Sequence, residues 1–292
     1  MNDLSRISRF SVSLFADDTC LVLGHSNLKL LESTCNNELK IIDDWFKANK
    51  LTANLKKASK YMLTAGTMNK NNLPEIELRM GSTILERVEK IKYLGVMLDE
   101  SFNWSAHVSQ LKTKLASSVG IISKLRYCVD TKLLVQVYHA LIASRLHYAI
   151  TSWGAAAQTV LSPVQVLQNR AVRFISRTPR YTRLDTAYLN LRLLKLHDIY
   201  KLQLTKFMLS YEKRTLPPFF LNYFQSTNRT HNYPTHFANT NTYRPIRCNK
   251  SVSQRSIRFT APTHWNELLS SIKTSSKSKF KKEYNNYVFS SY

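Results

Sequence analysis

Apolar and polar residues alternate in two different ways along the first hundred residues. Residues 11–23 (SVSLFADDTCLVL) place apolar and β-branched residues on both sides of a short polar centre, which predicts a tight β-hairpin. From Leu28 to Phe46 large apolar residues then recur every three or four positions. This spacing predicts an amphipathic helix, and Asn27 immediately before it is a suitable N-cap.

Shorter apolar runs follow, and the pattern then becomes helical near residue 104. Runs at residues 60–64 and 91–98 predict strands, and Gly95 indicates a bend or a close backbone approach within the second. Helical spacing beyond residue 104 covers four segments, 108–125, 133–142, 163–175 and 184–211. Residues 225–260 show little periodicity and are expected to form a loop. The expected fold class is therefore an α+β N-terminal portion followed by a mainly α-helical remainder.

The charge of the chain indicates that this two-part fold has a binding partner. The 292 residues contain 42 Lys or Arg and 19 Asp or Glu, a net charge of +23. Residues 151–292 hold 22 of the basic residues and only 5 of the acidic ones. A surface this basic attracts polyanions such as nucleic acid. Any carboxylates for metal chemistry must come from the N-terminal half.

Composition and apolar run length exclude several other classes of protein. The apolar content of 43% is too high for a disordered chain, and only 6 Gly and 8 Pro exclude a collagen-like one. No stretch approaches the ~18 apolar residues of a spanning helix, so no membrane partner is expected. The four cysteines are dispersed without a zinc-ligand spacing. An intracellular location, in the nucleus or the cytoplasm, is therefore expected.

Two adjacent carboxylates, Asp17 and Asp18, lie at the tip of the expected hairpin. On a tight turn both can face one space and bind Mg²⁺ through oxygen ligands. Two such ions would stabilise the attacking and leaving oxygens of a nucleotidyl transfer. Asp43 and Asp44 form a second pair, but consecutive side chains diverge by about 100° around a helix, so that pair is expected to face solvent.

The sequence around this pair resembles the catalytic hairpin of reverse transcriptases. Phe15-Ala16-Asp17-Asp18 is similar to the F-A-D-D form found in non-LTR (LINE-type) retrotransposons. Further segments resemble the same family in the same order along nearly the whole chain. They are Trp45–Lys57 (W-F-x-x-N-K-L-x-x-N-x-x-K), Lys92–His107 (K-Y-L-G-V…D…W-x-x-H), Gly120–Arg126, Tyr148–Gly154, Gln168–Arg173 (QNRAVR) and Ala261–Asn266 (APTHWN). The last two resemble jockey-like elements.

The resemblance implies a division of the chain into three parts. Residues 1–103 would be a partial polymerase palm that carries the catalytic β-hairpin, residues 104–155 a helical thumb, and residues 156–292 a basic, mostly helical C-terminal region. The implied reaction is RNA-directed DNA synthesis from deoxynucleoside triphosphates with Mg²⁺ as cofactor. Its nucleic-acid partners would be an RNA template and a DNA primer or target DNA.

Site roles follow from the resemblance residue by residue. Asp17 would be the main metal ligand and Asp18 the secondary one. Phe15 would pack beneath the primer end, and Lys57 would be a general acid toward pyrophosphate or a charge that positions phosphate. Tyr93, Leu94 and Gly95 would form the primer grip, where glycine lets a nucleic-acid strand approach the backbone.

The family pattern also implies a palm segment, with a third catalytic carboxylate, upstream of the hairpin. Because this chain begins about a dozen residues before Asp17, we expect the segment to be missing and the chain to be inactive alone, with weak or absent Mg²⁺ binding. The alternative function is a non-enzymatic nucleic-acid-binding protein, either domesticated or a relic of the element.

Arginines recur every third or fourth residue in the basic C-terminal half, at Arg170, Arg173, Arg177 and Arg180. On a helix they would form a positive stripe. Pro179 is expected to end that helix, so that the stripe continues into the following turn. The functional interpretation is contact with a template RNA or target DNA backbone, and the alternative is a solvated basic surface.

Overall fold

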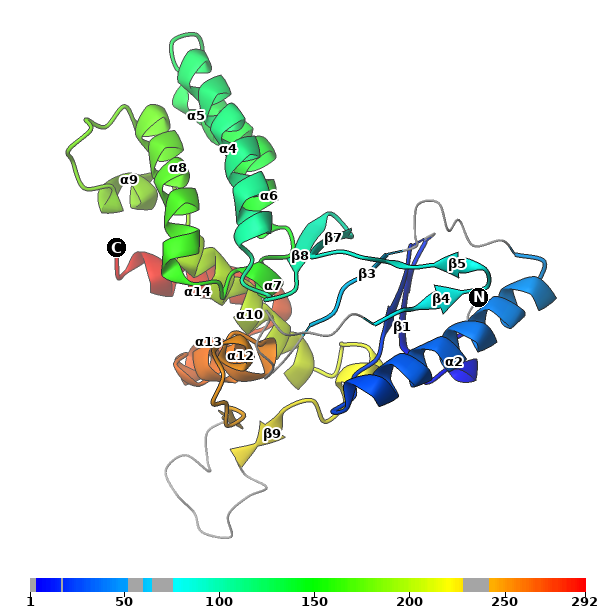
Figure 1. Ribbon diagram of the computed structural model, residues 1–292. Helices are drawn as coiled ribbons and strands as arrows, with labels where there is room; N and C mark the ends of the chain where they lie inside the picture. Colours follow the sequence, from blue (N-terminus) through cyan, green and yellow to red (C-terminus); the bar gives the residue numbers. More distant parts are fainter. Residues whose placement is uncertain (1–3, 17, 52–59, 65–75, 228–241) are drawn as a thin grey trace. The chain divides into compact units, whose positions relative to one another are not determined.

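The computed structural model describes residues 4–16, 18–51, 60–64, 76–227 and 242–292. The chain divides into two compact units, Met1–Phe102 and Asn103–Tyr292 (Figure 1). Its fold is mixed α+β and rich in helix, which agrees with the expected fold class at that level. The residues expected to form a thumb and a C-terminal region both lie in the second unit.

The first unit contains the expected hairpin. Strands β1 (Ser11–Phe15) and β2 (Asp18–Val22) pair antiparallel, with Phe15 opposite Asp18. This register leaves a two-residue connection, and Ala16 within it has a left-handed φ of 49°. Two-residue hairpin loops need positive φ because their twist must match that of the strands.

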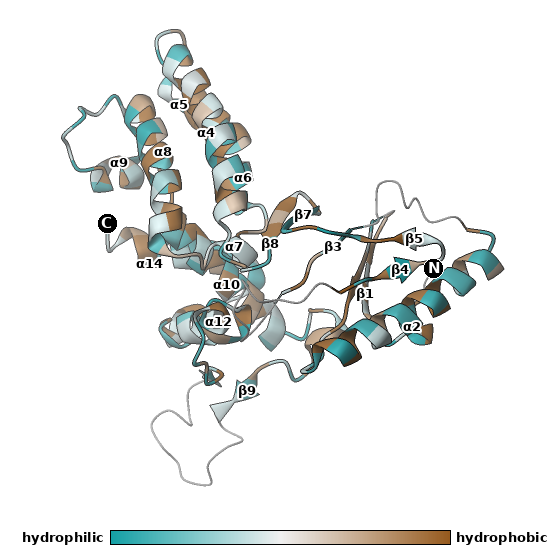
Figure 2. Ribbon diagram, in the orientation of Figure 1, coloured by the Kyte–Doolittle hydropathy of each residue, from teal (hydrophilic) through white to brown (hydrophobic). Residues whose placement is uncertain are grey.

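Helix α2 (Leu28–Ala48) packs against this part of the unit through its apolar face. Asn27 caps it as expected, because its side-chain oxygen accepts hydrogen bonds from the Lys29 and Leu30 amides at 2.9 and 3.3 Å. Figure 2 shows polar and apolar residues on different sides of α2. The apolar side shares a buried core with residues from the short helix α1 (Leu4–Ile7), the hairpin region and the later strands, among them Leu4, Phe10, Ile42, Leu63, Leu78 and Met80.

The remaining strands of the first unit are short. They are β3 (Lys60–Tyr61), β4 (Arg79–Met80), β5 (Thr83–Ile84), β6 (Glu86–Arg87), β7 (Lys90–Tyr93) and β8 (Val96–Asp99). Strand β3 pairs parallel with β6, whereas β4 with β5 and β7 with β8 form antiparallel hairpins.

Two of the strand predictions need correction. The strand expected at residues 60–64 has two residues, and the strand expected at 91–98 is a hairpin. Leu94 and Gly95 have φ values of 44° and 77°, the signature of a two-residue turn that reverses the chain between β7 and β8. Gly95 therefore serves a chain reversal, which periodicity alone does not distinguish from a bend.

The second unit is almost entirely helical. Its first half contains α4 (Ser105–Leu125), α5 (Thr131–Tyr138), the π-helix η2 (His139–Ala143), α6 (Ser144–His147), α7 (Ile150–Trp153), α8 (Gln158–Ser176) and α9 (Asp185–Asn190). Its second half contains α10 (Leu196–Glu212), the 3-10 helix η3 (Pro218–Phe220), the strand pair β9 (Gln225–Ser226) and β10 (Tyr243–Arg244), then α11 (Ser251–Gln254), α12 (Ile257–Asn266), α13 (Ser270–Lys273) and α14 (Lys277–Phe289).

Two segments of the second unit differ from the pattern-based expectation. The helix expected over 184–211 is two helices, since Arg192 adopts a left-handed φ of 52° between them. The loop expected over 225–260 contains the β9–β10 pair, α11 and the start of α12. Tertiary contacts rather than local periodicity produce this order, because the Asn266 side chain bonds both the amide and the carbonyl of Tyr243.

Helix α8 packs along α4 and continues through an internal proline. Pro163 has no amide hydrogen to donate to the Thr159 carbonyl, four residues earlier. The Ser162 hydroxyl donates to that carbonyl instead, at 3.4 Å. With the Thr159 carbonyl satisfied in this way, the helix extends through Pro163. It begins at Gln158, five residues before the expected start at Pro163.

Trp153 and Gly154 lie at a point where α7 meets α10. The Trp153 indole is buried and donates to the Tyr148 carbonyl at 2.9 Å. A Cβ atom on Gly154 would lie 2.4 Å from the Tyr200 ring and 2.6 Å from the Ile150 carbonyl oxygen. Glycine at this position therefore lets two helices approach each other closely.

Two glycines of this unit give a matched stability test. We expect Gly154→Ala to destabilise the second unit by about 2 kcal/mol or more, because the added methyl group overlaps Tyr200 and a backbone oxygen. Gly120→Ala in α4 meets open space and should stabilise by up to about 1 kcal/mol through helix propensity. Urea unfolding measures the free energy of unfolding of both variants. Equal changes in that free energy would contradict the close approach of Tyr200 to Gly154.

Candidate active-site hairpin and nucleic-acid interface

The hairpin presents Asp18 and Phe15 to solvent at its closed end. Asp18 is the first residue of β2 and is exposed, and the side chain of Phe15 opposite it is 62% exposed. Asp17 lies outside the described residues, as does Lys57. The roles expected for Asp17 and Lys57 therefore stay predictions.

The second aspartate pair is arranged differently. Lys47 on the same helix lies 2.5 Å from an Asp43 oxygen and 4.0 Å from an Asp44 oxygen. Asp44 is exposed and Asp43 is half-buried. This pair is thus engaged by a cation of its own helix, whereas Asp18 stands at the closed end of a hairpin.

Tyr93 responds electrostatically to two residues of the hairpin strand β2, although it is 75 positions from Asp18 in sequence. Burial raises the pKa of its phenol, and the nearby Cys20 and Asp18 side chains raise the pKa further. Negative charge on those two groups disfavours the phenolate, which requires them to lie within electrostatic range. Asp18 therefore acts electrostatically on Tyr93, and Leu94 and Gly95 form the turn immediately after Tyr93.

The four predicted arginines lie at one end of α8 and in the segment after it. Arg170 and Arg173 are on the last turns of the helix, Arg177 is its C-cap with a left-handed φ of 54°, and Arg180 follows. Arg170, Arg177 and Arg180 are exposed. Arg173 is half-buried and donates to the Pro179 carbonyl, which ties the helix to the turn beyond it.

A fifth arginine joins this group from the end of α4. The Arg126 guanidinium lies 4.5 Å from the centre of the Tyr127 ring and 4.8 Å from that of Phe174 on α8. Arg177 donates to the Arg126 carbonyl at 3.3 Å. Tyr127 is 76% exposed, so the stack opens to solvent. No local spacing in the sequence connects Arg126 to α8, so periodicity alone does not indicate that it belongs to this surface.

We call these five residues, Arg126, Arg170, Arg173, Arg177 and Arg180, the arginine end. Within the described part of the chain none of them forms an ion pair with a carboxylate. Asp130, the acidic residue nearest in sequence to Arg126, caps α5 by accepting from the Leu133 amide at 2.8 Å. Guanidinium groups without a carboxylate partner suit phosphate oxygens. Tyr181, which is 94% exposed, adds an aromatic surface nearby in sequence.

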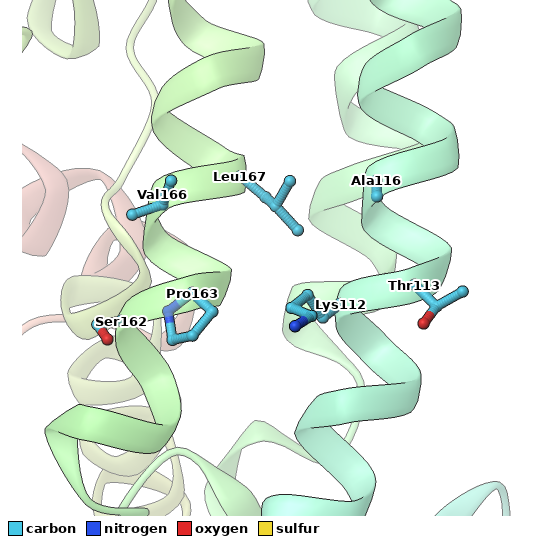
Figure 3. A pocket seen from close by; sticks show the side chains of 7 residues that line it. All are labelled: Lys112, Thr113, Ala116, Ser162, Pro163, Val166 and Leu167. Atoms are coloured by element: carbon cyan, nitrogen blue, oxygen red, sulfur yellow. The ribbon is translucent and has the colours of Figure 1, made fainter.

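A groove of about 590 Å³ lies between α4 and α8 (Figure 3). Figure 3 shows Leu167 directed toward α4, and Lys112 directed toward α8. The lining consists of Lys112, Thr113, Ala116, Ser162, Pro163, Val166 and Leu167. It contains no carboxylate, thiol or imidazole, so it offers neither metal ligands nor an acid–base pair, and it contains none of the predicted site residues.

Carboxylate oxygens are suitable ligands for Mg²⁺, which fits the chemistry expected of the hairpin. Asp18 is one such donor, but no group of three or more His, Cys, Asp or Glu side chains among the described residues is arranged to hold a metal ion. Among the described helices none is long and apolar enough to cross a membrane.

The chain is similar to RNA-directed DNA polymerases encoded by mobile elements. It is 24% identical over 192 residues to the "RNA-directed DNA polymerase from mobile element jockey" of Drosophila funebris, across 64% of this chain and 20% of that protein. It is 30% identical over 196 residues to the "Probable RNA-directed DNA polymerase from transposon BS" of Drosophila melanogaster, across 62% of this chain and 20% of that protein.

A third relative is the "Retrovirus-related Pol polyprotein from type-1 retrotransposable element R1" of Bradysia coprophila, 23% identical over 169 residues, across 57% of this chain and 16% of that protein. These matches confirm the resemblance to reverse transcriptases of non-LTR retrotransposons. The chain spans about a fifth of the length of the curated relatives it matches. Neither a protein-family model nor a solved structure matches it.

The electrostatic effect of Asp18 on Tyr93 can be tested by titration. We expect Asp18→Asn to lower the pKa of Tyr93 toward its ordinary value, because removing a negative charge makes the phenolate easier to form. Asp44→Asn, which removes an exposed carboxylate on α2, should leave that pKa unchanged. NMR titration of the tyrosine ring carbons measures both, and an unchanged Tyr93 in Asp18→Asn would contradict this effect.

Proposed function

We propose that this chain, a homologue of the RNA-directed DNA polymerases of non-LTR retrotransposons, is a fragment of such a polymerase. The parent reaction is RNA-templated DNA synthesis from deoxynucleoside triphosphates. The observation that carries the proposal is the match to several curated polymerases over about 60% of the chain. The structure supports it with a carboxylate hairpin in one unit and an unpaired arginine end in the other.

In this proposal the first unit contributes part of the reaction centre. Mg²⁺, when bound, would stabilise the charge that develops on the transferring phosphate, and Asp17 and Asp18 would hold it. The two-residue loop keeps the Asp18 carboxylate at the closed end of a hairpin, and the exposed Phe15 ring beside it offers an apolar surface for a primer end. Tyr93 at the end of β7, with the turn that follows it, would form the primer grip, where the backbone would approach a primer strand.

The second unit would bind the nucleic-acid backbone through the arginine end. Arginine binds phosphate bidentately and stays charged at all physiological pH values. The hydrogen bonds from Arg173 to Pro179 and from Arg177 to Arg126 hold the ends of α4 and α8 together with the segment after α8. Exposed Tyr127 and Tyr181 would stack on unpaired bases, which is tolerant of sequence.

We further propose that the chain assayed alone does not extend a primer. Two adjacent carboxylates cannot clamp two metal ions as the two-metal scheme requires. The relatives that carry the polymerase name are about five times as long as the segment matched here. Binding of nucleic acid would persist, because the arginine end belongs to a different unit from the aspartate pair. That separation is the observation that favours the second candidate, a nucleic-acid-binding protein without catalytic activity.

Removing four positive charges from the arginine end tests the binding role. We expect the combined substitution of Arg170, Arg173, Arg177 and Arg180 by Gln to weaken binding of an RNA–DNA hybrid strongly. The slope of log Kobs against log salt should become shallower by about 3 to 4, since each lost phosphate contact accounts for roughly 0.9. Fluorescence anisotropy at several salt concentrations measures this slope.

The matched control removes four exposed lysines of the first unit, Lys29, Lys40, Lys50 and Lys90, by substitution with Gln. It changes the net charge by the same amount but leaves the arginine end intact. We expect a much smaller loss of affinity. Equal losses in the two variants would show that net charge, rather than the arginine end, determines binding.

A further inference from the structure

A group of aromatic side chains reaches the surface of the second unit in the segment between α10 and β9. This segment contains the 3-10 helix η3 and reads LPPFFLNYF over residues 216–224. Phe219 is 75% exposed and Leu221 is 61% exposed, although both side chains are large and apolar. Single exposed apolar residues are common on protein surfaces, whereas a contiguous group of them marks an interaction surface.

The exposed Phe219 ring belongs to a connected series of rings. Its centre lies 5.2 Å from that of Phe220 and 6.2 Å from that of Tyr223, and both of these residues are half-buried. Phe220 in turn packs on Phe207 of α10, with ring centres 5.2 Å apart and ring planes at 81°. Edge-to-face pairs at such separations are favourable. The exposed ring therefore rests on an ordered aromatic base.

Hydrogen bonds fix the backbone that carries these rings. The amides of Phe220 and Tyr223 donate to the carbonyls of Pro217 and Phe220, each at 3.0 Å. The Tyr211 hydroxyl of α10 donates to the Phe224 carbonyl at 3.2 Å and accepts from the Phe224 amide at 3.3 Å. A surface that is ordered before its ligand arrives loses less conformational freedom on binding. The segment is thus preorganised to present Phe219.

Arg258 of α12 supplies a cation beside these rings. Its guanidinium lies 5.0 Å from the centre of the Tyr223 ring, and the residue is exposed. Among the residues that the structure describes, no carboxylate forms an ion pair with Arg258. We call Phe219, Phe220, Tyr223 and Arg258 the aromatic platform.

The part of the chain that builds the aromatic platform contains basic residues and no acidic ones. Between Glu212 and Glu267 the sequence has no Asp or Glu, whereas Lys or Arg occurs at positions 213, 214, 229, 244, 247, 250, 255 and 258. A surface of this composition attracts a polyanion and disfavours a partner that itself carries positive charge. Exposed aromatic rings together with positive charge are the combination that binds unpaired nucleotides.

We propose that the aromatic platform binds single-stranded nucleic acid, with an unpaired base stacked on Phe219 and a phosphate of the same strand bound by Arg258. Every base has an aromatic face, so this contact would be tolerant of sequence. Bases inside a duplex are already stacked on their neighbours, so the platform would prefer single strands. The inference rests on the proposed function for its class of partner, but it assigns a second surface that includes no residue of the arginine end.

Two strands that differ only in their bases test the stacking. A short oligothymidylate of about 12 nucleotides has a base on every sugar, and an abasic strand of the same length presents the phosphates alone. In the full chain we expect Phe219→Leu to weaken binding of oligothymidylate about fivefold or more, because leucine keeps an apolar side chain but has no ring. Binding of the abasic strand should not change, and Phe219→Trp should retain the affinity for oligothymidylate. Fluorescence anisotropy measures these dissociation constants.

Leu221 and Arg258 give the controls. Leu221→Ala removes exposed apolar surface from the same segment without removing a ring, and it should leave both affinities unchanged. Arg258→Gln should weaken both strands by similar factors, since it removes a phosphate contact. Oligothymidylate binding that is unchanged in Phe219→Leu, or weakened no more than that of the abasic strand, would overturn the proposal. A loss in Leu221→Ala as large as that in Phe219→Leu would also overturn it, because it would indicate a general apolar surface suited to a protein partner.

The variant with Gln at Arg170, Arg173, Arg177 and Arg180 keeps this claim apart from the proposed function. If the arginine end does not bind nucleic acid, that variant binds hybrid as well as the parent chain does, and Phe219→Leu still weakens oligothymidylate binding. If the aromatic platform does not bind a base, Phe219→Leu has no effect, and the variant with four Gln still loses affinity for hybrid.

Discussion

One buried amide organises the helical unit. The side chain of Gln168 on α8 is almost fully buried, and its nitrogen donates to the Tyr138 hydroxyl at 2.9 Å and to the Leu194 carbonyl at 2.8 Å. Its oxygen accepts from the Leu196 amide at 2.9 Å. These bonds satisfy the backbone where the chain turns between α9 and α10, and they join that turn to α8 and the end of α5. A buried amide with all its partners in place specifies a single arrangement of these elements.

The hydrogen bonds of Gln168 show that the QNRAVR segment contains both residues that build the fold and an exposed one. In the QNRAVR segment Gln168 and Ala171 are buried, and Asn169 accepts from the Tyr188 hydroxyl at 2.7 Å. Arg170 is left exposed on the same helix. The Trp153–Gly154 pair is also structural, since it lets α7 approach α10. Much of the resemblance to the polymerases thus consists of residues that build the fold, while Arg170 faces solvent.

Local pattern was sufficient for features that depend on neighbouring residues. The carboxylate hairpin, α2 with its Asn27 cap and the long helices α4 and α8 all follow from periodicity and capping chemistry. It was insufficient where distant residues decide. The Arg126 stack on Phe174 and the hydrogen bonds between Asn266 and Tyr243 each join separate elements, and no spacing in the sequence indicates them. The break between α9 and α10 also depends on a distant residue. Gln168 of α8 bonds the Leu194 carbonyl and the Leu196 amide, which follow the break.

We propose that this chain binds nucleic acid through the arginine end but does not catalyse DNA synthesis alone. The decisive experiment is primer extension with an RNA template, a DNA primer, deoxynucleoside triphosphates and Mg²⁺, alongside a measurement of hybrid binding by the same preparation. We expect salt-sensitive binding without template-dependent incorporation, and unchanged binding in Asp17→Ala. Robust incorporation by the parent chain that Asp17→Ala abolishes would contradict it.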